Sequence, residues 1–294
     1  CSGWPVFEDY LMGRSDGQPK SAAWAADIAG IPAGEIEALA RRLPAERVLV
    51  VVSHSLQRAE HGEQPVWMGA VLAAMLGQFG LPGGGYNYAL GAIANYGRRM
   101  NAAAIAAFPQ GKNPVKEFIP VARIADMLLN PGAPFEYNGQ RLTYPDIKLV
   151  YWAGGNPFHH HQDLNRLRHA FAELDTLVVH EIGWTATARH ADIVLPCTMT
   201  LERNDIGGAP TDPLMVAMHK LAEPHGQARD DYAIFSDLAA RAGHGDAFTE
   251  GRSSEQWLRH LYETTQDALA AKGLDAPNFD EFWQRGELKL PQLP

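Results

Sequence analysis

A short glycine turn carries the residues of this chain that are best suited to binding a ligand. Gly154 and Gly155 follow an apolar run, and Asn156 and Pro157 come directly after them. Two successive glycines let a phosphate or a sugar approach the backbone, and asparagine offers both a donor and an acceptor. Glu181 ends the next apolar run, where a dinucleotide-binding sheet holds a ribose. The pattern indicates nucleotide binding, and an acidic helix cap is the alternative for Glu181.

The spacing of this turn differs from that of the common nucleotide motifs. It is not G-x-G-x-x-G, and the chain has neither a P-loop nor a G-x-S-x-G nucleophile turn. A plain NAD-binding domain is therefore the weaker interpretation, and hydrolysis by a serine nucleophile is not indicated.

Other residues that could bind a metal or act as nucleophiles have simpler explanations. His159, His160 and His161 are adjacent, so they cannot all face one ion in regular structure, and hydrogen bonding at a helix start is favoured over a metal site. Cys1 and Cys197 are the cysteines of the chain. They provide no disulfide framework and cannot hold an iron–sulfur cluster, and we interpret Cys197 as a small apolar filler. We expect no metal ligand within this sequence.

Composition sets the broad class. The chain has 294 residues, of which 46% are hydrophobic and 20% charged, enough for one large or two ordinary folded domains. Its formal net charge of −9 argues against a nucleic-acid partner. No apolar run reaches the roughly 20 residues of a membrane span. The compartment cannot be predicted from this sequence.

The elements around the turn form a βαβ pattern. Residues 149–153, 176–180 and 192–196 are apolar runs that predict strands, and residues 163–174 predict the crossover helix between the first two. Sheets of such parallel strands bind ligands at the loops that follow the carboxyl ends of the strands. We therefore predict an α/β protein of two Rossmann-like lobes, with short, mostly parallel sheets flanked by helices.

A second polar loop follows an earlier strand. Residues 47–52 predict a buried strand, and residues 53–64 form the loop at its carboxyl end. Arg58 is the natural contact there for an anion or a polar substrate, and a solvated surface arginine is the alternative.

Helices and a turn complete the coarse organisation. Residues 65–79 predict a helix whose Trp67, Met68 and Met75 we assign to the core. Asn138-Gly139 predicts a hairpin turn. The turn-rich stretch around it suggests a boundary between one lobe at residues 1–140 and another at residues 141–294.

Several long motifs resemble one enzyme family. The stretches are YWAGGNPFHHHQDLNRL, VVHEIGWTATARHADIVLP, LERNDI, SLQRAEHGEQPVWM and ARDDYAIF. Together they resemble the molybdopterin oxidoreductases of the dimethyl-sulfoxide reductase family, in the branch of trimethylamine-N-oxide, dimethyl-sulfoxide and biotin (methionine) sulfoxide reductases. The resemblance extends from about Val6 to Pro291.

The resemblance implies a molybdenum cofactor, bis(molybdopterin guanine dinucleotide), and assigns residues to it. Gly154, Gly155, Asn156 and Pro157 would line the dinucleotide. The second lobe, residues 141–294, would then bind the guanine dinucleotide. The first lobe, residues 1–140, would lie on the substrate-funnel side.

The remaining cofactor residues follow from the same motifs. Glu181 would hold a ribose with His180 beside it, and Thr185 would contact the diphosphate region. Asp231 would pair with guanine, because a carboxylate can accept two N–H donors from one base edge.

On the substrate side, the resemblance implies an S-oxide or N-oxide substrate facing Arg58. The branch has tryptophan just before its SLQR motif, and this chain has His54, which puts the substrate preference in question. The resemblance also implies that the serine ligand of molybdenum precedes Cys1 and that a carboxyl-terminal domain follows Pro294. The chain is then a central part that is inactive in isolation. The alternative is a cofactor-binding fragment without catalysis, and the electron donor is left open.

Overall fold

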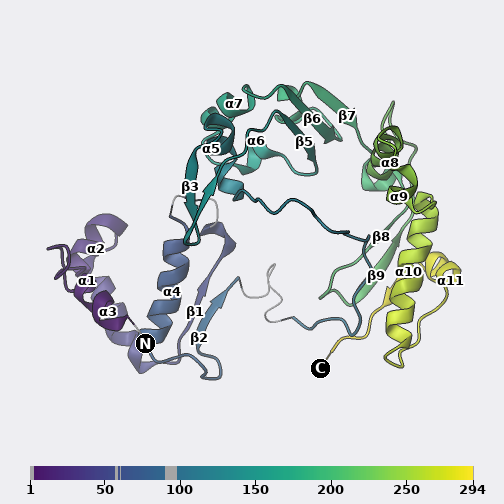
Figure 1. Ribbon diagram of the computed structural model, residues 1–294. Coiled ribbons are helices and arrows are strands. Elements are labelled where there is room, and N and C mark those ends of the chain that lie inside the picture. The colour runs from purple at the N-terminus through teal and green to yellow at the C-terminus, as the bar shows by residue number, and fades with distance from the viewer. Residues whose placement is uncertain (1–2, 57–58, 60, 90–97, 294) are drawn as a thin grey trace. The chain divides into compact units, whose positions relative to one another are not determined.

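The computed structural model of the chain describes residues 3–56, 59, 61–89 and 98–293 (Figure 1). The chain divides into two compact units, Cys1–Tyr96 and Gly97–Pro294. Both combine helices with short sheets, and two of the sheets are parallel, which confirms the α/β prediction. The predicted lobe boundary near residue 140 lies inside the second unit and stays a prediction.

A two-stranded parallel sheet organises the first unit. Strand β1 (Leu49–Val52) pairs with β2 (Gly85–Tyr88), and α4 (Glu63–Met75) makes the crossover that parallel pairing requires. Other helical elements precede the sheet or follow β1: α1 (Trp4–Leu11), α2 (Ala22–Ala29), α3 (Ala33–Arg42) and two 3₁₀ turns, Leu43–Ala45 and His54–Leu56. Ser21 starts α2 by accepting a hydrogen bond from the Trp24 N–H, as helix-capping serines do.

Helix α4 corrects one expectation. Trp67, Met68 and Met75 are exposed by 67%, 45% and 51%, although we had assigned them to the core. The helix is apolar around its whole circumference, and a two-stranded sheet can bury only one side of it. That side carries Gly69, where an added Cβ would lie 3.0 Å from the Tyr86 ring, so the absence of a side chain permits this close approach.

A three-stranded parallel sheet organises the part of the second unit that concerns the glycine turn. Its order is β5 (Leu149–Ala153), β6 (Thr176–Glu181) and β7 (Ile193–Pro196). Helices α6 (Pro157–His160) and α7 (Leu164–Phe171) connect β5 to β6. The predicted βαβ unit is confirmed, with the strand bounds within one residue of those expected.

Smaller elements flank this sheet. Strands β3 (Pro134–Tyr137) and β4 (Gln140–Thr143) form the predicted hairpin. Its turn residues Asn138 and Gly139 have φ values of 49° and 72°, which a two-residue hairpin turn requires. The 3₁₀ turn Val121–Arg123 leads into α5 (Ile124–Leu129), which packs against α7.

An antiparallel sheet and a group of helices form the rest of the second unit. The sheet has the order β10 (Glu287–Lys289), β9 (Leu214–Met218), β8 (Asp205–Gly207). The helices are α8 (Asp231–Arg241), α9 (Gly245–Thr249), α10 (Ser254–Ala270) and α11 (Phe279–Arg285). Ser253 and Gln256 form a reciprocal capping box at the start of α10.

Two apolar cores hold these layers. One lies between the parallel sheet and its helices and includes Leu167, Phe171 and Val179. The other joins the antiparallel sheet to α10 and α11 and includes Met215, Tyr262 and Phe282. Each core fixes strands and helices whose ends carry the polar residues discussed below. None of the helices in the described ranges combines the length and apolar character that crossing a bilayer demands.

Candidate functional site

The carboxyl ends of β5, β6 and β7 meet at one edge of the parallel sheet. Ala153 pairs with His180, and Glu181 pairs with Pro196, so all three strands end within one residue step of each other. The loops that leave this edge therefore share one surface, the place where open α/β sheets bind ligands.

The glycine turn after β5 keeps its backbone open. Gly154 and Gly155 have φ values of 80° and 79°, a conformation that favours glycine. The Trp152 indole N–H donates to the Gly154 carbonyl at 2.8 Å and holds the turn. A Cβ added to Gly154 would meet no atom within 4 Å, so the space beside this backbone is free for a ligand.

Asn156 and Pro157 build the end of the turn. Asn156 stands at the N-terminus of α6, and its side-chain oxygen accepts a hydrogen bond from the buried Thr187 hydroxyl. The Pro157 ring is almost fully buried at the first position of α6. Its contribution is thus to the shape of the turn, because its side chain does not reach the surface.

Glu181 and Thr185 lie together at the end of β6. The Thr185 hydroxyl donates to Glu181 Oε1 at 3.0 Å, and the Ile182 N–H donates to Oε2 at 3.2 Å. Thr185 Oγ1 in turn accepts from the Ala188 N–H. The carboxylate organises the turn that follows its strand, and its remaining lone pairs can accept hydrogen bonds from a sugar.

His180 connects this edge to Asp231. Its Nδ1 lies 2.6 Å from Asp231 Oδ1, and its Nε2 lies 2.6 Å from the Tyr151 hydroxyl. The His180 side chain is 1% exposed and the Asp231 side chain 49% exposed. Burial, followed by the charge of Asp231, raises the pKa of Tyr151, which keeps the phenol protonated as a hydrogen-bond donor.

The start of α8 is tied to the end of β7. The Arg229 N–H donates to the Pro196 carbonyl, and the Thr198 N–H donates to the Arg229 carbonyl. The Thr198 hydroxyl also donates to Asp230 Oδ1 at 3.0 Å. These bonds bring Asp231, the first residue of α8, to the same edge as the glycine turn.

Cys197 follows β7, and its N–H donates to the Glu181 carbonyl at 3.1 Å. Burial raises the pKa of its thiol, and the charges of Asp231 and Glu181 raise it further. A thiol held in its neutral form is a poor nucleophile, which agrees with the interpretation of Cys197 as a filler.

A cavity of about 270 Å³ adjoins Asp231. Its lining includes Asp230, Asp231, Arg203, Tyr232 and Trp257. Carboxylates, a guanidinium, hydroxyls and an amide line it together with aromatic and aliphatic side chains, a mixture typical of small-molecule sites.

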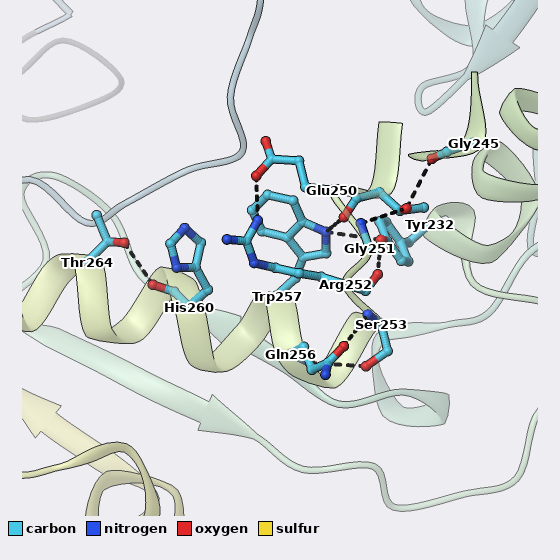
Figure 2. A network of polar contacts seen from close by, with 11 residues as sticks. Tyr232, Gly245, Glu250, Gly251, Arg252, Ser253, Gln256, Trp257, His260 and Thr264 are labelled. Carbon is cyan, nitrogen blue, oxygen red and sulfur yellow. Dashed lines mark hydrogen bonds and ion pairs between the residues drawn. The ribbon is translucent and has the colours of Figure 1, made fainter. Parts of the chain in front are cut away.

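Figure 2 shows the polar network around Tyr232 and Trp257, two residues that line this cavity. The buried Trp257 indole N–H donates to the Tyr232 hydroxyl at 3.0 Å and to the Thr249 carbonyl at 3.2 Å. The Tyr232 hydroxyl donates to the Arg252 carbonyl at 2.6 Å. The Arg252 guanidinium lies over the Trp257 ring, 4.7 Å from its centroid, and pairs with Glu250. The network fixes the residue next to Asp231 to the start of α10.

The substrate-side residues predicted from sequence belong to the first unit. His54 Nδ1 lies 3.0 Å from the Tyr88 hydroxyl at the ends of β1 and β2. His54 Nε2, the Tyr86 hydroxyl and Asn87 Oδ1 are buried atoms with no hydrogen-bond partner among the described residues. Arg58 lies outside the residues that the structure describes.

The three adjacent histidines lie at the end of α6. His159 and His160 form its last turn, and His161 follows the helix. Within the described ranges, no three His, Cys, Asp or Glu side chains gather in a way that could hold a metal ion.

Sequence reasoning missed the supporting residues of the site. Tyr151, Thr187 and Tyr88 stand behind His180, Asn156 and His54, respectively. Tyr151 was visible as a polar-tipped residue inside an apolar strand, a position at which a buried hydroxyl needs a partner. Its partner, His180, lies on the neighbouring strand, so the sequence around Tyr151 alone does not identify it.

Comparisons with known proteins show which proteins this chain is similar to. A family model described as molybdopterin oxidoreductase matches residues 21–241. Biotin sulfoxide reductase from Cereibacter sphaeroides is 47% identical over 99% of this chain. Dimethyl sulfoxide/trimethylamine N-oxide reductase from the same organism is 46% identical over 99%, and trimethylamine-N-oxide reductase from Haemophilus influenzae is 46% identical over 96%.

These alignments cover only part of the relatives. The chain spans 39%, 37% and 36% of the lengths of those three proteins, respectively. The family model, by contrast, matches well over half of this chain. The chain therefore belongs to the molybdopterin oxidoreductase family.

Proposed function

We propose that this chain is the central, dinucleotide-binding part of a molybdenum-dependent reductase of S-oxides and N-oxides. Support comes from its family and from the names of the relatives it matches, which are sulfoxide and N-oxide reductases. The cofactor is a bis(molybdopterin guanine dinucleotide), and this chain binds a guanine nucleotide end of it.

One observation carries the proposal most directly. The open glycine turn, Glu181 with Thr185, and Asp231 all lie at the carboxyl edge of one parallel sheet. An anionic diphosphate needs N–H groups and free space, which the turn at Gly154 and Gly155 offers. A ribose and a guanine need acceptors for hydroxyl and N–H donors, which the two carboxylates offer.

The proposed roles follow the same order. The backbone at Gly154 and Gly155, with Asn156, lines the dinucleotide, and Pro157 shapes the turn. Thr185 faces the diphosphate region and Glu181 holds a ribose. Asp231 accepts the paired N–H donors of guanine, and His180 acts through Asp231.

The first unit contributes to the substrate funnel in this proposal. When bound, the molybdenum centre supplies the oxygen-atom transfer chemistry. His54, whose Nδ1 lies 3.0 Å from the Tyr88 hydroxyl at the ends of β1 and β2, serves in this proposal as a polar residue on the substrate side. Arg58 serves as a second polar contact to the substrate.

Nucleotide binding tests the proposal. Isothermal titration of this chain with GDP, ADP and NAD should show at least about a tenfold preference for GDP over ADP. Asp231→Asn should remove that preference, because an amide cannot accept two N–H donors on one edge. Asp230→Asn is the matched control, since the Asp230 carboxylate accepts from Thr198 and has no role assigned in guanine binding.

Two outcomes would contradict the proposal. Tight NAD binding without GDP binding would indicate a plain dinucleotide domain. Equal binding of GDP and ADP would remove the guanine role of Asp231. A reduced-viologen assay with dimethyl sulfoxide separates catalysis from cofactor binding. The chain alone should show no turnover, and the longer protein with molybdenum should show it.

A further inference from the structure

His180 lies beneath the surface of the proposed guanine site. Its side chain is 1% exposed, whereas the Asp231 side chain next to it is 49% exposed. A ligand at the sheet edge can thus reach the Asp231 carboxylate but not the His180 ring. Any effect of His180 on a ligand must pass through Asp231.

The protonation pattern of the ring follows from its two partners. An ionised carboxylate only accepts hydrogen bonds, so Nδ1, 2.6 Å from Asp231 Oδ1, carries the proton. Nε2 is then the acceptor and receives the Tyr151 hydroxyl at 2.6 Å. Both nitrogens of a neutral imidazole are satisfied in this arrangement, so the buried ring needs no charge.

Aromatic contacts fix the plane of the ring. Phe235 stacks on His180 with centroids 4.9 Å apart and an interplanar angle of 28°. Tyr151 meets it at 62° with centroids 5.3 Å apart. Phe235 lies four residues after Asp231 on α8, so one helix face carries both the carboxylate and the ring that holds its partner.

We propose that His180 is a positioning residue that sets the direction of the Asp231 carboxylate and thereby its selectivity for guanine. This inference rests on the proposed function, in which Asp231 pairs with guanine. With Oδ1 held by His180, the carboxylate cannot rotate freely, and its outward edge keeps lone pairs on both oxygens for two parallel N–H donors. Guanine offers N1–H and the 2-amino group in that geometry, whereas hypoxanthine offers only N1–H.

Two substitutions of His180 test which side of its ring matters, the Nδ1 side that faces Asp231 or the Nε2 side that faces Tyr151. The amide nitrogen of Asn occupies about the position of Nδ1, and that of Gln about the position of Nε2. His180→Asn therefore keeps a donor to Asp231, while His180→Gln keeps only a group that reaches Tyr151. Both variants carry a side-chain amide, and they differ in whether that amide takes the place of Nδ1 or of Nε2.

Titration of the chain with GDP and IDP provides the readout. Loss of one hydrogen bond to a charged group predicts about a tenfold weaker GDP affinity in His180→Gln. The ratio of GDP to IDP affinity should fall with it, because a carboxylate free to rotate no longer presents both oxygens to one base edge. His180→Asn should keep both the affinity and the ratio close to those of the unsubstituted chain. A His180→Gln variant with an unchanged ratio would overturn the positioning role.

Nitrogen-15 NMR of the unsubstituted chain keeps the inference testable if the variants do not fold. The expected spectrum shows a neutral His180 ring protonated at Nδ1, and Tyr151→Phe should change the Nε2 shift. A ring protonated at Nε2 alone would overturn the proposed hydrogen bond to Asp231. The expected tautomer in a chain that binds GDP no better than ADP would remove the guanine role of Asp231. A chain that prefers GDP but shows the other tautomer would remove only the role of His180.

Discussion

Each of the two acids at the sheet edge is held by a hydrogen-bond donor from within the chain. Glu181 accepts from the Thr185 hydroxyl, and Asp231 lies against the His180 ring. A carboxylate fixed in this way loses less rotamer freedom when a ligand arrives than a free one would. In the proposed function, the contact that stabilises this edge also prepares it for ligand binding.

Gly154 provides a direct test at the residue scale. Gly154→Ala should lower the free energy of unfolding by about 1–2 kcal/mol, because alanine is strained at positive φ. It should also weaken GDP binding by about tenfold, since the added methyl group enters the open space that the diphosphate approaches. Urea unfolding and calorimetric titration measure the two effects.

Gly273→Ala is the control for that substitution. Gly273 has a φ of 71° and an equally open Cβ position, but it follows α10, outside the proposed site. It should lose similar stability and keep full GDP affinity. Equal GDP affinity in the two variants would show that the space beside Gly154 is not used by the nucleotide.

Residue types pointed to the residues that we propose to face the ligand, but not to the residues that support them. Gly154, Glu181 and Asp231 stand at strand or helix ends, which local patterns reveal. Tyr151 and His180 form their contact across paired strands, and Asp231 lies 51 residues after His180. Such contacts depend on strand register and on the path of the chain, so no local pattern contains them.

At the element scale, regular segments with clear ends were predictable. The Asn138-Gly139 turn, the Ser253 capping box and the strands around residue 154 all have local signals with a physical cause. The core assignment on α4 was wrong for a different reason. Apolar composition predicts that a helix can be buried, but which of its faces is covered depends on the area of the neighbouring sheet.

The packing of α10 predicts a dependence of stability on pH. Tyr262 on this helix is 1% exposed, and its hydroxyl donates to the Pro277 carbonyl at 2.8 Å. Burial raises the pKa of Tyr262 from 10.0 to about 12. The unfolded chain thus releases this proton near pH 10 and the folded chain near pH 12. Stability is complete below about pH 10 and falls as the pH rises toward 12, by up to about 1.4 kcal/mol per pH unit.

Tyr262→Phe isolates this effect. Denaturant unfolding between pH 9 and 12 should show a shallower fall in stability for the variant, on top of a constant loss from the missing hydrogen bond. Tyr144 and Tyr151 also have pKa values raised by burial, so the slope should decrease but not vanish. Tyr137→Phe, at an exposed tyrosine, is the control. An identical slope in Tyr262→Phe and the original chain would contradict the assignment.

At the scale of the whole molecule, composition and long motifs were more informative than local pattern. The acidic net charge argued against a nucleic-acid partner, and the motifs pointed to the family that the comparisons establish. The division of the chain is a different kind of property. A turn-rich stretch near residue 140 resembles a linker locally, and the lobe boundary there stays a prediction. The compact units divide between residues 96 and 97, and residues on both sides of the hairpin share one apolar core.

The two units predict where nucleotide affinity resides. All the residues proposed to hold the dinucleotide lie between Gly154 and Asp231, and both described cores are built from residues of the second unit. A chain of residues 97–294 should therefore fold and keep GDP affinity within about threefold of the full chain, since a unit with its own core can fold alone. Thermal unfolding and calorimetric titration with GDP check this on the two chains in parallel. A folded 97–294 chain that has lost GDP affinity would assign part of the nucleotide site to the first unit. Retained affinity would leave the first unit with the substrate-side role proposed for His54.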